Sequence, residues 1–482
     1  MFPYKSLIEI DKKRKRALYL QISDCFVGLI KKGVIPPTTA LPGSREMAKI
    51  LSVNRQTVVA SYDELESQGW VEVIPKRGTF VKEELPIITQ RKLKKIRNRD
   101  RFPHINLYQN ALIIDAKSNC KLVIDRGTAD DRLAPIDSIS RAYRSALKSC
   151  QRSRYLSNID IFKLDRSEEI VSNYLNRTRG LRCTRENIIL TQGSQMGIYL
   201  AAKTLILKND SVIVGETSYK GADDVFKSIG TKLIEAKVDK HGLDINQVES
   251  ICKRRNIKCV YVTPHHHLPT TVTLSAGRRM KLLQLASIYD FYIIEDDYDF
   301  DYHYKSSPLL PLASSDEEGR VIYVGSMSKN LAPGIRFGYM VANPELIIEL
   351  KRLRMMIDRY GDLVIERAIT SMIHEGEIER HLRKCLKIYR ERRDYFCGLL
   401  NEKLGDFVHF EIPQGGLAVW CEFVDDIDLR SVTKKAIEKG LFISEGSIYS
   451  PQKKNLNATR MGFASLNFGE MEEAVGILQG CI

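Results

Sequence analysis

A lysine and an arginine stand close together in a turn rich in small residues. The stretch "VGSMSKNLAPGIRFG" places Lys329 shortly after the apolar run VIYV at 321–324, and Arg336 seven residues further on, beyond a Pro-Gly pair. A lysine in such a turn can condense through its amine with an aldehyde cofactor. A cofactor of this kind also needs an acid for its ring nitrogen, a cradle for its phosphate and a platform for its ring.

Residues suited to these roles follow other short apolar runs, and pyridoxal phosphate is the aldehyde cofactor that they suit. Asp296 would hold the pyridine nitrogen protonated, Tyr298 would donate to the ring oxygen, and Tyr219 would stack on the ring. Backbone N–H groups at the start of a helix bind phosphate well, and Ser194 and Gln195 open such a helix. The predicted phosphate ligands are Ser194, Gln195, Ser326 and Arg336.

The elements that must position these residues have the pattern of an α/β protein. Five runs rich in Ile and Val alternate with helix-like segments: NIILT at 187–191, SVIVG at 211–215, CVYVT at 259–263, YIIED at 292–296 and VIYVG at 321–325. Such runs are typical of buried parallel strands joined by crossover helices. Ligands of these sheets bind beyond the carboxyl ends of the strands, where the candidate residues lie.

The positive charge of the chain is concentrated at its N-terminus. Residues 1–101 hold 21 Lys and Arg against 11 Asp and Glu, a net charge of +10 out of +14 for all 482 residues. A basic segment ahead of a nearly neutral remainder suggests a polyanionic partner.

The first eighty residues read as a winged helix-turn-helix. The segment 17–33 is amphipathic, a second helix follows "LPGS" with Ser44 as its expected N-cap, and a third begins after Asn54, which is placed to cap it. The runs WVEVI and GTFV flank "PKR" and predict a hairpin. In this motif the third helix lies in the major groove of DNA.

The predicted DNA contacts come from three places in this unit. The early residues of the third helix would face base edges, the start of the second helix would hold a phosphate, and the tip of the hairpin would reach the minor groove or a phosphate. These residues are Arg55, Gln56 and Thr57, then Ser44 and Arg45, then Arg77.

Three domains are expected: a DNA-binding domain at 1–82, a linker at 83–121 and an effector domain at 122–482. The linker contains "RKLKKIRNRDR", with seven cations and one acid, which suggests a solvated segment. No run is long and apolar enough to span a bilayer, and the first residues lack the features of a signal peptide. The ten cysteines are scattered without a CxxC pair, so a cytoplasmic protein with reduced thiols is predicted.

Both parts of the chain resemble known families. "LPGSREMA" and "RQTVVASYDELESQG" resemble the GntR-type winged helix, and "SMSKNLAPGIRFGY" resembles the lysine motif of fold-type I aminotransferases. "IIEDDYDFDY" is similar to a variant found in the MocR/GabR-type regulators, which fuse these two parts. The resemblance implies a large, mostly parallel sheet with a smaller C-terminal α/β part, and a pyridoxal phosphate-dependent regulator of transcription that forms a head-to-tail homodimer.

The same resemblance identifies a ligand for an effector. "ATRMGFA" at 458–464 is similar to the aminotransferase segment whose arginine, here Arg460, clamps a substrate carboxylate. The regulator would then sense pyridoxal phosphate, or an amino compound that forms an external aldimine with it. The alternative of a surface arginine stays open. The identity of the effector, the operator, and the choice between activation and repression do not follow from the sequence.

Three departures from the family motifs surround the expected substrate position. The loop "PHHHLPTTVTLS" at 264–275 has Leu268 where aminotransferases carry an asparagine, and Thr271 where they carry a glycine. The segment "SNIDIFKLDR" at 157–166 has lost a family motif as well. Since adjacent residues of one loop seldom ligate a single ion, His265, His266 and His267 predict no metal site.

These observations leave three functions to weigh. The first is a DNA-binding regulator that uses pyridoxal phosphate. The second is a working aminotransferase with a DNA-binding head, against which the degraded substrate loops count. The third is a regulator that has lost the cofactor, against which the intact residues Asp296, Tyr298, Lys329 and Arg336 count. The first is preferred, without a physiological enzymatic role.

Overall fold

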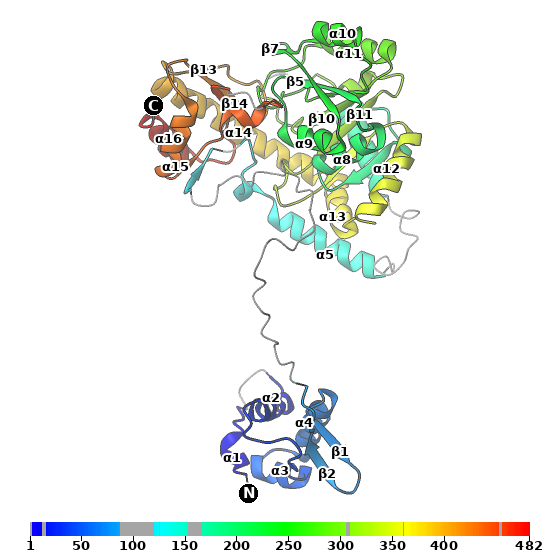
Figure 1. The fold of residues 1–482 in the computed structure, drawn as a ribbon, viewed down its shortest axis with the longest axis vertical. Coiled ribbons are helices and arrows are strands. Elements are labelled where there is room, and N and C mark those ends of the chain that lie inside the picture. Colours follow the sequence, from blue (N-terminus) through cyan, green and yellow to red (C-terminus); the bar gives the residue numbers. More distant parts are fainter. Residues whose placement is uncertain are drawn as a thin grey trace. The chain divides into compact units, whose positions relative to one another are not determined.

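The computed structural model describes residues 2–11, 16–86, 120–124, 126–152, 166–304, 309–359, 361–452 and 456–482. The chain divides into two compact units, Met1–Asn106 and Leu107–Ile482, which we call the head and the body (Figure 1). The predicted linker lies mostly outside the described residues, so its bounds stay a prediction. No described helix is both long and apolar enough to cross a membrane.

The described residues of the head form four helices and a hairpin. Its elements are α1 (Tyr4–Leu7), α2 (Leu18–Lys31), α3 (Ser44–Leu51), α4 (Arg55–Ser67), β1 (Val71–Ile74) and β2 (Gly78–Val81). The two strands pair antiparallel, with Val71 opposite Val81. The order of α2 to β2 confirms the winged helix-turn-helix, and α1 is an addition that the sequence patterns did not indicate.

The head has its own apolar core. Ile22 and Phe26 of α2 and Val58 of α4 are fully buried, and the ring of Phe26 meets that of Tyr62 edge to face at 6.0 Å. One cap was predicted correctly and one was not. The Asn54 side chain accepts a hydrogen bond from the backbone N–H of Gln56 at the start of α4, whereas α3 begins one residue earlier than expected: Gly43 is its N-cap and Ser44 is its first helical residue.

A seven-stranded sheet forms the centre of the body. Its spatial order is β4-β12-β11-β10-β9-β5-β6, and every neighbouring pair is parallel except the two that β12 makes. The strands are β4 (Ile188–Thr191), β5 (Ser211–Gly215), β6 (Lys232–Ala236), β9 (Cys259–Val262), β10 (Tyr292–Asp297), β11 (Val321–Ser326) and β12 (Gly338–Val341). All five predicted runs are strands of this sheet. The edge strand β6 and the antiparallel β12 were not predicted.

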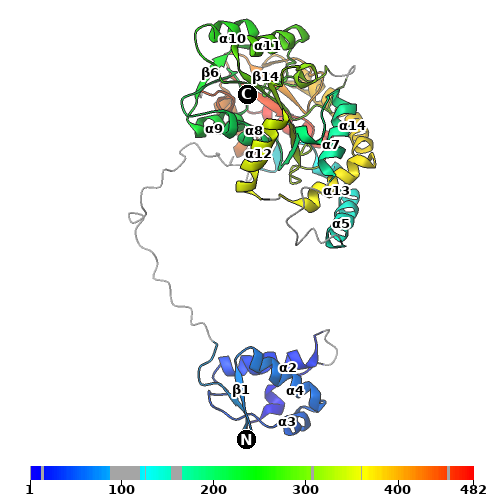
Figure 2. The same ribbon diagram turned by 90° about the vertical axis from the view of Figure 1, so that its right-hand side faces the viewer.

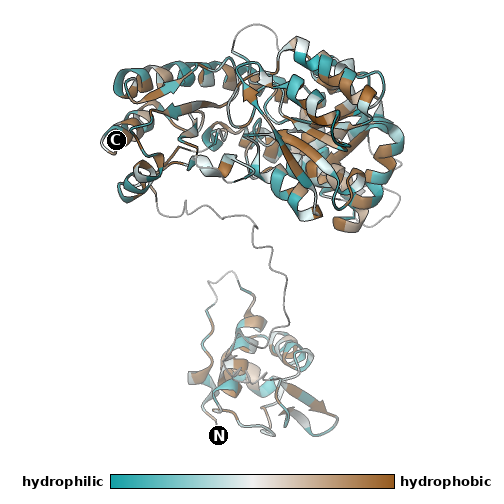
Figure 3. Ribbon diagram, turned by 45° about the horizontal axis from the view of Figure 1, so that its top comes forward, coloured by the Kyte–Doolittle hydropathy of each residue, from teal (hydrophilic) through white to brown (hydrophobic). Residues whose placement is uncertain are grey.

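Helices cover both faces of the sheet, because successive strand residues point to opposite sides. Ile294 of β10 packs with α8 (Ser194–Leu205), α9 (Lys220–Ile229) and α12 (Pro344–Ile357). Its neighbour Ile293 packs with α10 (Ile245–Cys252) and α11 (Ala276–Tyr289) on the other face. Figure 2 shows α10 and α11 together, apart from α8 and α12. The strands are hydrophobic along most of their length (Figure 3), as expected of a sheet buried on both faces.

A smaller α/β part completes the body. The antiparallel strands β13 (Val408–Phe410), β14 (Ala418–Phe423) and β16 (Ala458–Gly462) pack with α14 (Glu377–Leu404), α15 (Leu429–Glu438) and α16 (Phe468–Gln479). Two short strands, β15 (Leu441–Phe442) and β3 (Leu122–Val123), pair beside it, and β7 (Val238–Asp239) and β8 (Gly242–Leu243) pair near the large sheet. The remaining helices are α5 (Ile136–Arg152), α7 (Ser167–Arg179) and α13 (Leu363–His374).

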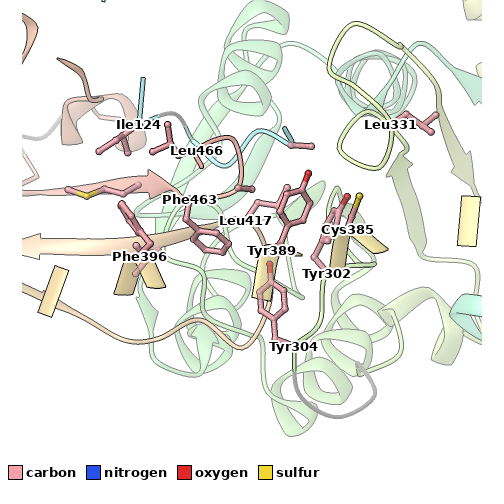
Figure 4. Close-up of a cluster of buried hydrophobic side chains, with 14 of the residues drawn as sticks. Ile124, Tyr302, Tyr304, Leu331, Cys385, Tyr389, Phe396, Leu417, Phe463 and Leu466 are labelled. Carbon is pink, nitrogen blue, oxygen red and sulfur yellow. The ribbon is translucent and has the colours of Figure 1, made fainter. Parts of the chain in front are cut away.

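One apolar core joins this part to the segment that follows β10. Tyr302 meets Tyr389 of α14 with ring centroids 5.5 Å apart, and Tyr304 donates a hydrogen bond to the carbonyl of Gly416. Figure 4 shows these tyrosines beside Leu417 and Phe463 of the C-terminal part. The fold is therefore the one expected: a large, mostly parallel sheet with a smaller C-terminal α/β part, preceded by a winged head.

Candidate cofactor site and nucleic-acid interface

The carboxyl ends of three adjacent strands bring the predicted lysine and acid together. β10 lies between β9 and β11, with Asp296 opposite Val324 of β11. The turn after β11 carries Lys329, whose Nζ lies 4.1 Å from the centre of the Tyr298 ring. Lys329, Asp296 and Tyr298, 33 residues apart at most in sequence, are thus neighbours because adjacent parallel strands end at one edge.

Asp296 is the most informative residue of the site. It is 3% exposed, and its Oδ2 accepts a hydrogen bond of 2.8 Å from the hydroxyl of Tyr261. Its Oδ1 is buried without a hydrogen-bond partner among the described residues. Burial raises the pKa of Asp296 to about 7, while Tyr261 and the charge of Lys329 act in the opposite direction. A protonated pyridine nitrogen would supply both the missing donor and a counter-charge.

A second group of residues surrounds the start of α8, where a phosphate would bind. Gly193 has a φ of +84°, and a Cβ at this position would collide with the guanidinium of Arg336. Arg336 donates to Ser328 Oγ at 3.1 Å and to the carbonyl of Gln192 at 3.2 Å. Ser326 Oγ accepts from the backbone N–H of Ser328. The N–H groups at the start of α8 and a guanidinium therefore face one another in a space that only glycine leaves open.

Tyr219 and Gln195 are connected to each other. Tyr219 is the N-cap residue of α9, and its hydroxyl donates to Gln195 Oε1 at 2.9 Å. Gln195 Nε2 in turn donates to the carbonyl of Gly221. The side chain of Gln195 thus holds the tyrosine that was predicted to stack on the ring. Its backbone and that of Ser194, in the first turn of α8, are the parts suited to a phosphate.

Arg460 is a buried cation on β16, not a surface residue. It is 1% exposed, and its guanidinium donates to the carbonyls of Arg126 and Pro269, both at 2.9 Å, and to the hydroxyl of Tyr298 at 3.3 Å. Its hydrogen-bond acceptors among the described residues are thus neutral, although its charge also helps to lower the pKa of Asp299. A buried cation of this kind is well suited to the carboxylate of a bound ligand. The hydroxyl of Tyr298 itself donates to the carbonyl of His266, so its contact with the ring oxygen stays a prediction.

The three adjacent histidines point to three different partners. His265 Nδ1 lies 3.0 Å from Asp297 Oδ1, His266 Nδ1 lies 2.8 Å from Asp299 Oδ1, and His267 Nδ1 lies 2.8 Å from Thr270 Oγ1. Burial and the nearby charge of Arg460 lower the pKa of His267 to about 3. Among the described residues no group of His, Cys, Asp and Glu is arranged to hold a metal.

The head places its predicted DNA contacts around the starts of two helices. Arg55, the first residue of α4, donates to Ser44 Oγ at the start of α3 over 3.4 Å. Arg45 and Gln56 are exposed beside them, whereas Thr57 is partly buried and its N–H bonds to the carbonyl of Asn54. These helix starts present N–H groups and cations together, as phosphate binding requires.

The hairpin tip supplies a further basic position. Arg77 is exposed, with its guanidinium 5.8 Å from the centre of the Phe80 ring. Lys76 precedes it with a φ of +64°, and it too is exposed. Lys76 was not among the predicted DNA contacts, although its place in the "PKR" turn was a sufficient signal.

Two residues of the cofactor site were also missed from the sequence. Ser328 lies inside the lysine motif itself, so the motif could have indicated it. Tyr261 lies within the CVYVT run, where nothing separates it from an ordinary core tyrosine. Only the pairing of β9 with β10 brings its hydroxyl to Asp296. Asp160 and Asp165, which mark the lost family motif, lie outside the described residues.

The cofactor site yields a test of the phosphate cradle. In Gly193→Ala the new Cβ must displace Arg336 and also adopt a strained backbone. We expect the affinity for pyridoxal phosphate to fall by at least about tenfold, because a guanidinium–phosphate contact is charge-assisted. Gly277→Ala, in α11, is the matched control, since a Cβ there meets no atom within 4 Å. Equal affinities of the two variants, measured by fluorescence titration, would contradict this placement of the phosphate.

Comparison with known proteins agrees with both parts of the chain. The profile of the family "Aminotransferase class I and II" matches residues 128–478, and that of "Bacterial regulatory proteins, gntR family" matches residues 18–81. Two curated relatives align over nearly their whole lengths. The probable rhizopine catabolism regulatory protein MocR of Rhizobium meliloti is 26% identical over 98% of this chain and 95% of that protein. The uncharacterized HTH-type transcriptional regulator YdfD of Bacillus subtilis is 27% identical over 96% of each.

Among solved structures, a kynurenine aminotransferase of Pyrococcus horikoshii is similar to the body. It is 26% identical, with a TM-score of 0.68 over 76% of this chain and 91% of that one. The unpartnered oxygen of Asp296 and the cradle at Gly193 fit pyridoxal phosphate, the cofactor that the family indicates. The chain therefore belongs to the aminotransferase class I and II family, and its gntR-type head gives it the organisation of a MocR-type regulator.

Proposed function

We propose that this chain regulates transcription by binding an operator through its head, and that pyridoxal phosphate in its body makes this binding responsive to a small amino compound or to the cofactor itself. The head supports the first part through exposed cations at the starts of α3 and α4. The relatives that align over the whole chain support the same conclusion, because they include proteins named as transcriptional regulators.

One observation carries the cofactor part of this proposal. Asp296 keeps a buried oxygen that has no hydrogen-bond partner among the described residues, on the same sheet edge as Lys329. Leaving a buried polar atom unsatisfied costs free energy, so such an atom in a native site calls for a ligand. When bound, pyridoxal phosphate supplies an aldehyde that can be exchanged between amines and a ring that accepts electrons.

The residues of the chain suggest how an effector would be held. Lys329 offers the amine that a primary amine of the effector would replace, and Arg460 offers a buried guanidinium for a carboxylate. Because Arg460 lies on β16 of the C-terminal part and Lys329 follows β11 of the large sheet, one ligand would touch both parts of the body. A ligand shifts a conformational equilibrium only through its different affinities for the two states. Contacts with two parts of the fold provide such a difference.

A working aminotransferase is the less favoured alternative. The aromatic-amino-acid aminotransferase 1 of Thermococcus litoralis covers only 63% of this chain, whereas the regulators cover nearly all of it. Leu268 also places an apolar side chain at the loop where aminotransferases carry a hydrogen-bonding asparagine.

We further propose a homodimer, supported by an apolar face on α5. Ile136, Tyr143 and Leu147 are spaced seven and four residues apart, and each is more than a third exposed, at 59%, 38% and 43%. Residues at this spacing lie on one side of a helix. A second copy of the chain would cover them and would also present two heads to paired half-sites. The head-to-tail order of the subunits stays a prediction. No disulfide links any of the ten cysteines in the described part of the chain, and we propose a reducing cytoplasm as its compartment.

The cofactor assignment predicts the behaviour of one lysine. The visible absorption band of the protein-bound cofactor should be absent in Lys329→Ala and present in Lys220→Ala, whose side chain instead pairs with Asp224 beside Tyr219. Borohydride reduction followed by peptide mass spectrometry should place the adduct on Lys329. A band that persists in Lys329→Ala, or an adduct on another residue, would overturn the assignment. Amino compounds that shift this band and alter operator binding would identify the class of effector.

The DNA interface predicts two different effects in the head. With an operator selected from random duplexes by the full-length chain, Arg55→Ala should weaken binding by about 1–3 kcal/mol and relax specificity at one base pair. Arg77→Ala should weaken binding to all sequences and reduce the salt dependence by about one ion. Arg16→Ala, which breaks only an exposed pair with Asp24, is the control. Fluorescence anisotropy at several salt concentrations measures both effects. Unchanged affinity of the Arg55 and Arg77 double variant refutes this interface.

The apolar face of α5 predicts the oligomeric state. Leu147→Glu would bury a charge in the proposed interface and should convert the dimer into a monomer. Leu207→Glu is the control, because Leu207 is 74% exposed and lies outside α5. Light scattering coupled to size exclusion gives the masses. A monomeric wild-type chain, or a Leu147→Glu variant that remains dimeric, is incompatible with this face being the interface.

A further inference from the structure

The strand β10 ends in three consecutive acids, which the pleat of the sheet sends to opposite faces. Glu295 and Asp297 point to one face and Asp296 points to the other, because side chains alternate along a strand. Asp299 follows in the turn. All four are at most 4% exposed, so each needs a partner that offsets the cost of burial.

Two tyrosines on the neighbouring strands each donate a hydrogen bond to one of these acids, on opposite faces of the sheet. On β9, Tyr261 stands opposite Ile294 and therefore shares the face of Asp296, whose Oδ2 accepts its hydroxyl at 2.8 Å. On β11, Tyr323 stands opposite Glu295 and shares the face of Asp297, whose Oδ2 accepts its hydroxyl at 2.6 Å. The two tyrosine–carboxylate pairs are equivalent in geometry and differ only in the face of the sheet that they occupy.

The two carboxylates differ in what their second oxygen meets. Oδ1 of Asp297 lies 3.0 Å from a nitrogen of His265, and Asp299 has His266 at 2.8 Å. These are buried counter-groups supplied by the protein. Oδ1 of Asp296 has no hydrogen-bond partner among the described residues, and the charge of Lys329 acts to lower the pKa of this carboxyl. Asp297 Oδ1 and Asp299 Oδ2 also lack a hydrogen-bond partner among the described residues, but a histidine lies beside each of these two carboxylates. Asp296 is the aspartate of this set with no histidine beside it in the described part of the chain, which leaves its Oδ1 available to a ligand.

We propose that Tyr261 is a positioning residue of the cofactor site: its hydroxyl holds Oδ2 of Asp296 and thereby directs Oδ1, as an ionised acceptor, at the ring nitrogen of pyridoxal phosphate. A hydrogen bond from a neighbouring strand to one carboxylate oxygen restricts the rotation of the carboxylate group. The ring nitrogen therefore meets an acceptor of defined direction. This inference rests on the cofactor binding proposed above and adds the residue that sets the state of its acid partner.

The electrostatic surroundings of Asp296 explain why the hydroxyl is needed. Burial is the largest influence and raises its pKa, and the hydrogen bond from Tyr261 lowers it. Without that hydrogen bond, burial and the like charges of Asp297 and Asp299 would raise the pKa of Asp296 further. The carboxyl would then keep its proton at neutral pH. The other titratable groups that act with or on Asp296 are Asp297, Asp299, Lys329, Tyr219 and Tyr298.

The pair of tyrosines supplies a matched experiment in the full chain. Tyr261→Phe keeps the ring, including its edge contact with Phe226 at 6.0 Å, and removes only the hydroxyl. Its affinity for pyridoxal phosphate at about pH 7 should fall by about tenfold or more, the loss expected for one hydrogen bond to a charged group. Affinity should recover at about pH 9, where a carboxyl of raised pKa is ionised again.

Tyr323→Phe is the control, because it removes the same kind of hydrogen bond from Asp297 on the opposite face. It should leave both the affinity and its pH dependence as in the wild type. Circular dichroism and thermal unfolding of the cofactor-free variants establish that both are folded. Equal affinities of the Tyr261 variant and the wild type, or equal losses in the two tyrosine variants, overturn the inference. A wild-type chain that binds no pyridoxal phosphate overturns the proposed function itself, so the two failures are distinct.

Discussion

The body of this protein depends on keeping a carboxylate where water cannot solvate it. Asp296 is buried at the end of β10, and burial raises its pKa to about 7. One oxygen is held by Tyr261, and the other has no partner among the described residues. A buried carboxylate in this condition is unfavourable by itself and becomes favourable when a cation with a donor binds beside it. A protonated pyridine ring would meet this condition, as proposed above.

The residues around Asp296 keep its two carboxylate oxygens in these different environments. The pleat of β10 directs Asp296 and Asp297 to opposite faces of the sheet. The loop after β9 provides His265 as the partner of Asp297 and His266 as the partner of Asp299. The segment that follows β10 reaches Arg460 on β16 through Tyr298, and Tyr389 on α14 through Tyr302. The cofactor site and the C-terminal part are therefore connected through one short stretch of chain. Any ligand that bridges Lys329 and Arg460 acts on both ends of this connection.

The proposed phosphate ligands of the chain are of two different kinds. In the body, Arg336 is held by Ser328 and Gln192 opposite the start of α8, so its guanidinium is oriented before a ligand arrives. In the head, the proposed phosphate ligands are exposed cations: Arg45, Arg55 and Arg77. Their contribution to DNA binding would depend on the number of cations more than on a fixed geometry. Exposed cations are screened by salt, whereas a pre-oriented group beside helix N–H donors is less affected.

Sequence alone determined five strands of the large sheet, the order of the two units and most of the residues proposed for the site. The five apolar runs became strands because buried parallel strands need continuous apolar stretches, and Lys329, Asp296 and Arg336 lie in motifs whose spacing is local. Tertiary structure decided what depends on neighbours distant in sequence. Tyr261 reads as a core residue until β9 is placed beside β10, and Arg460 reads equally as a surface residue until β16 is buried against the loop of Pro269. Such roles come from packing between segments, and no local pattern of residues records which segments will meet.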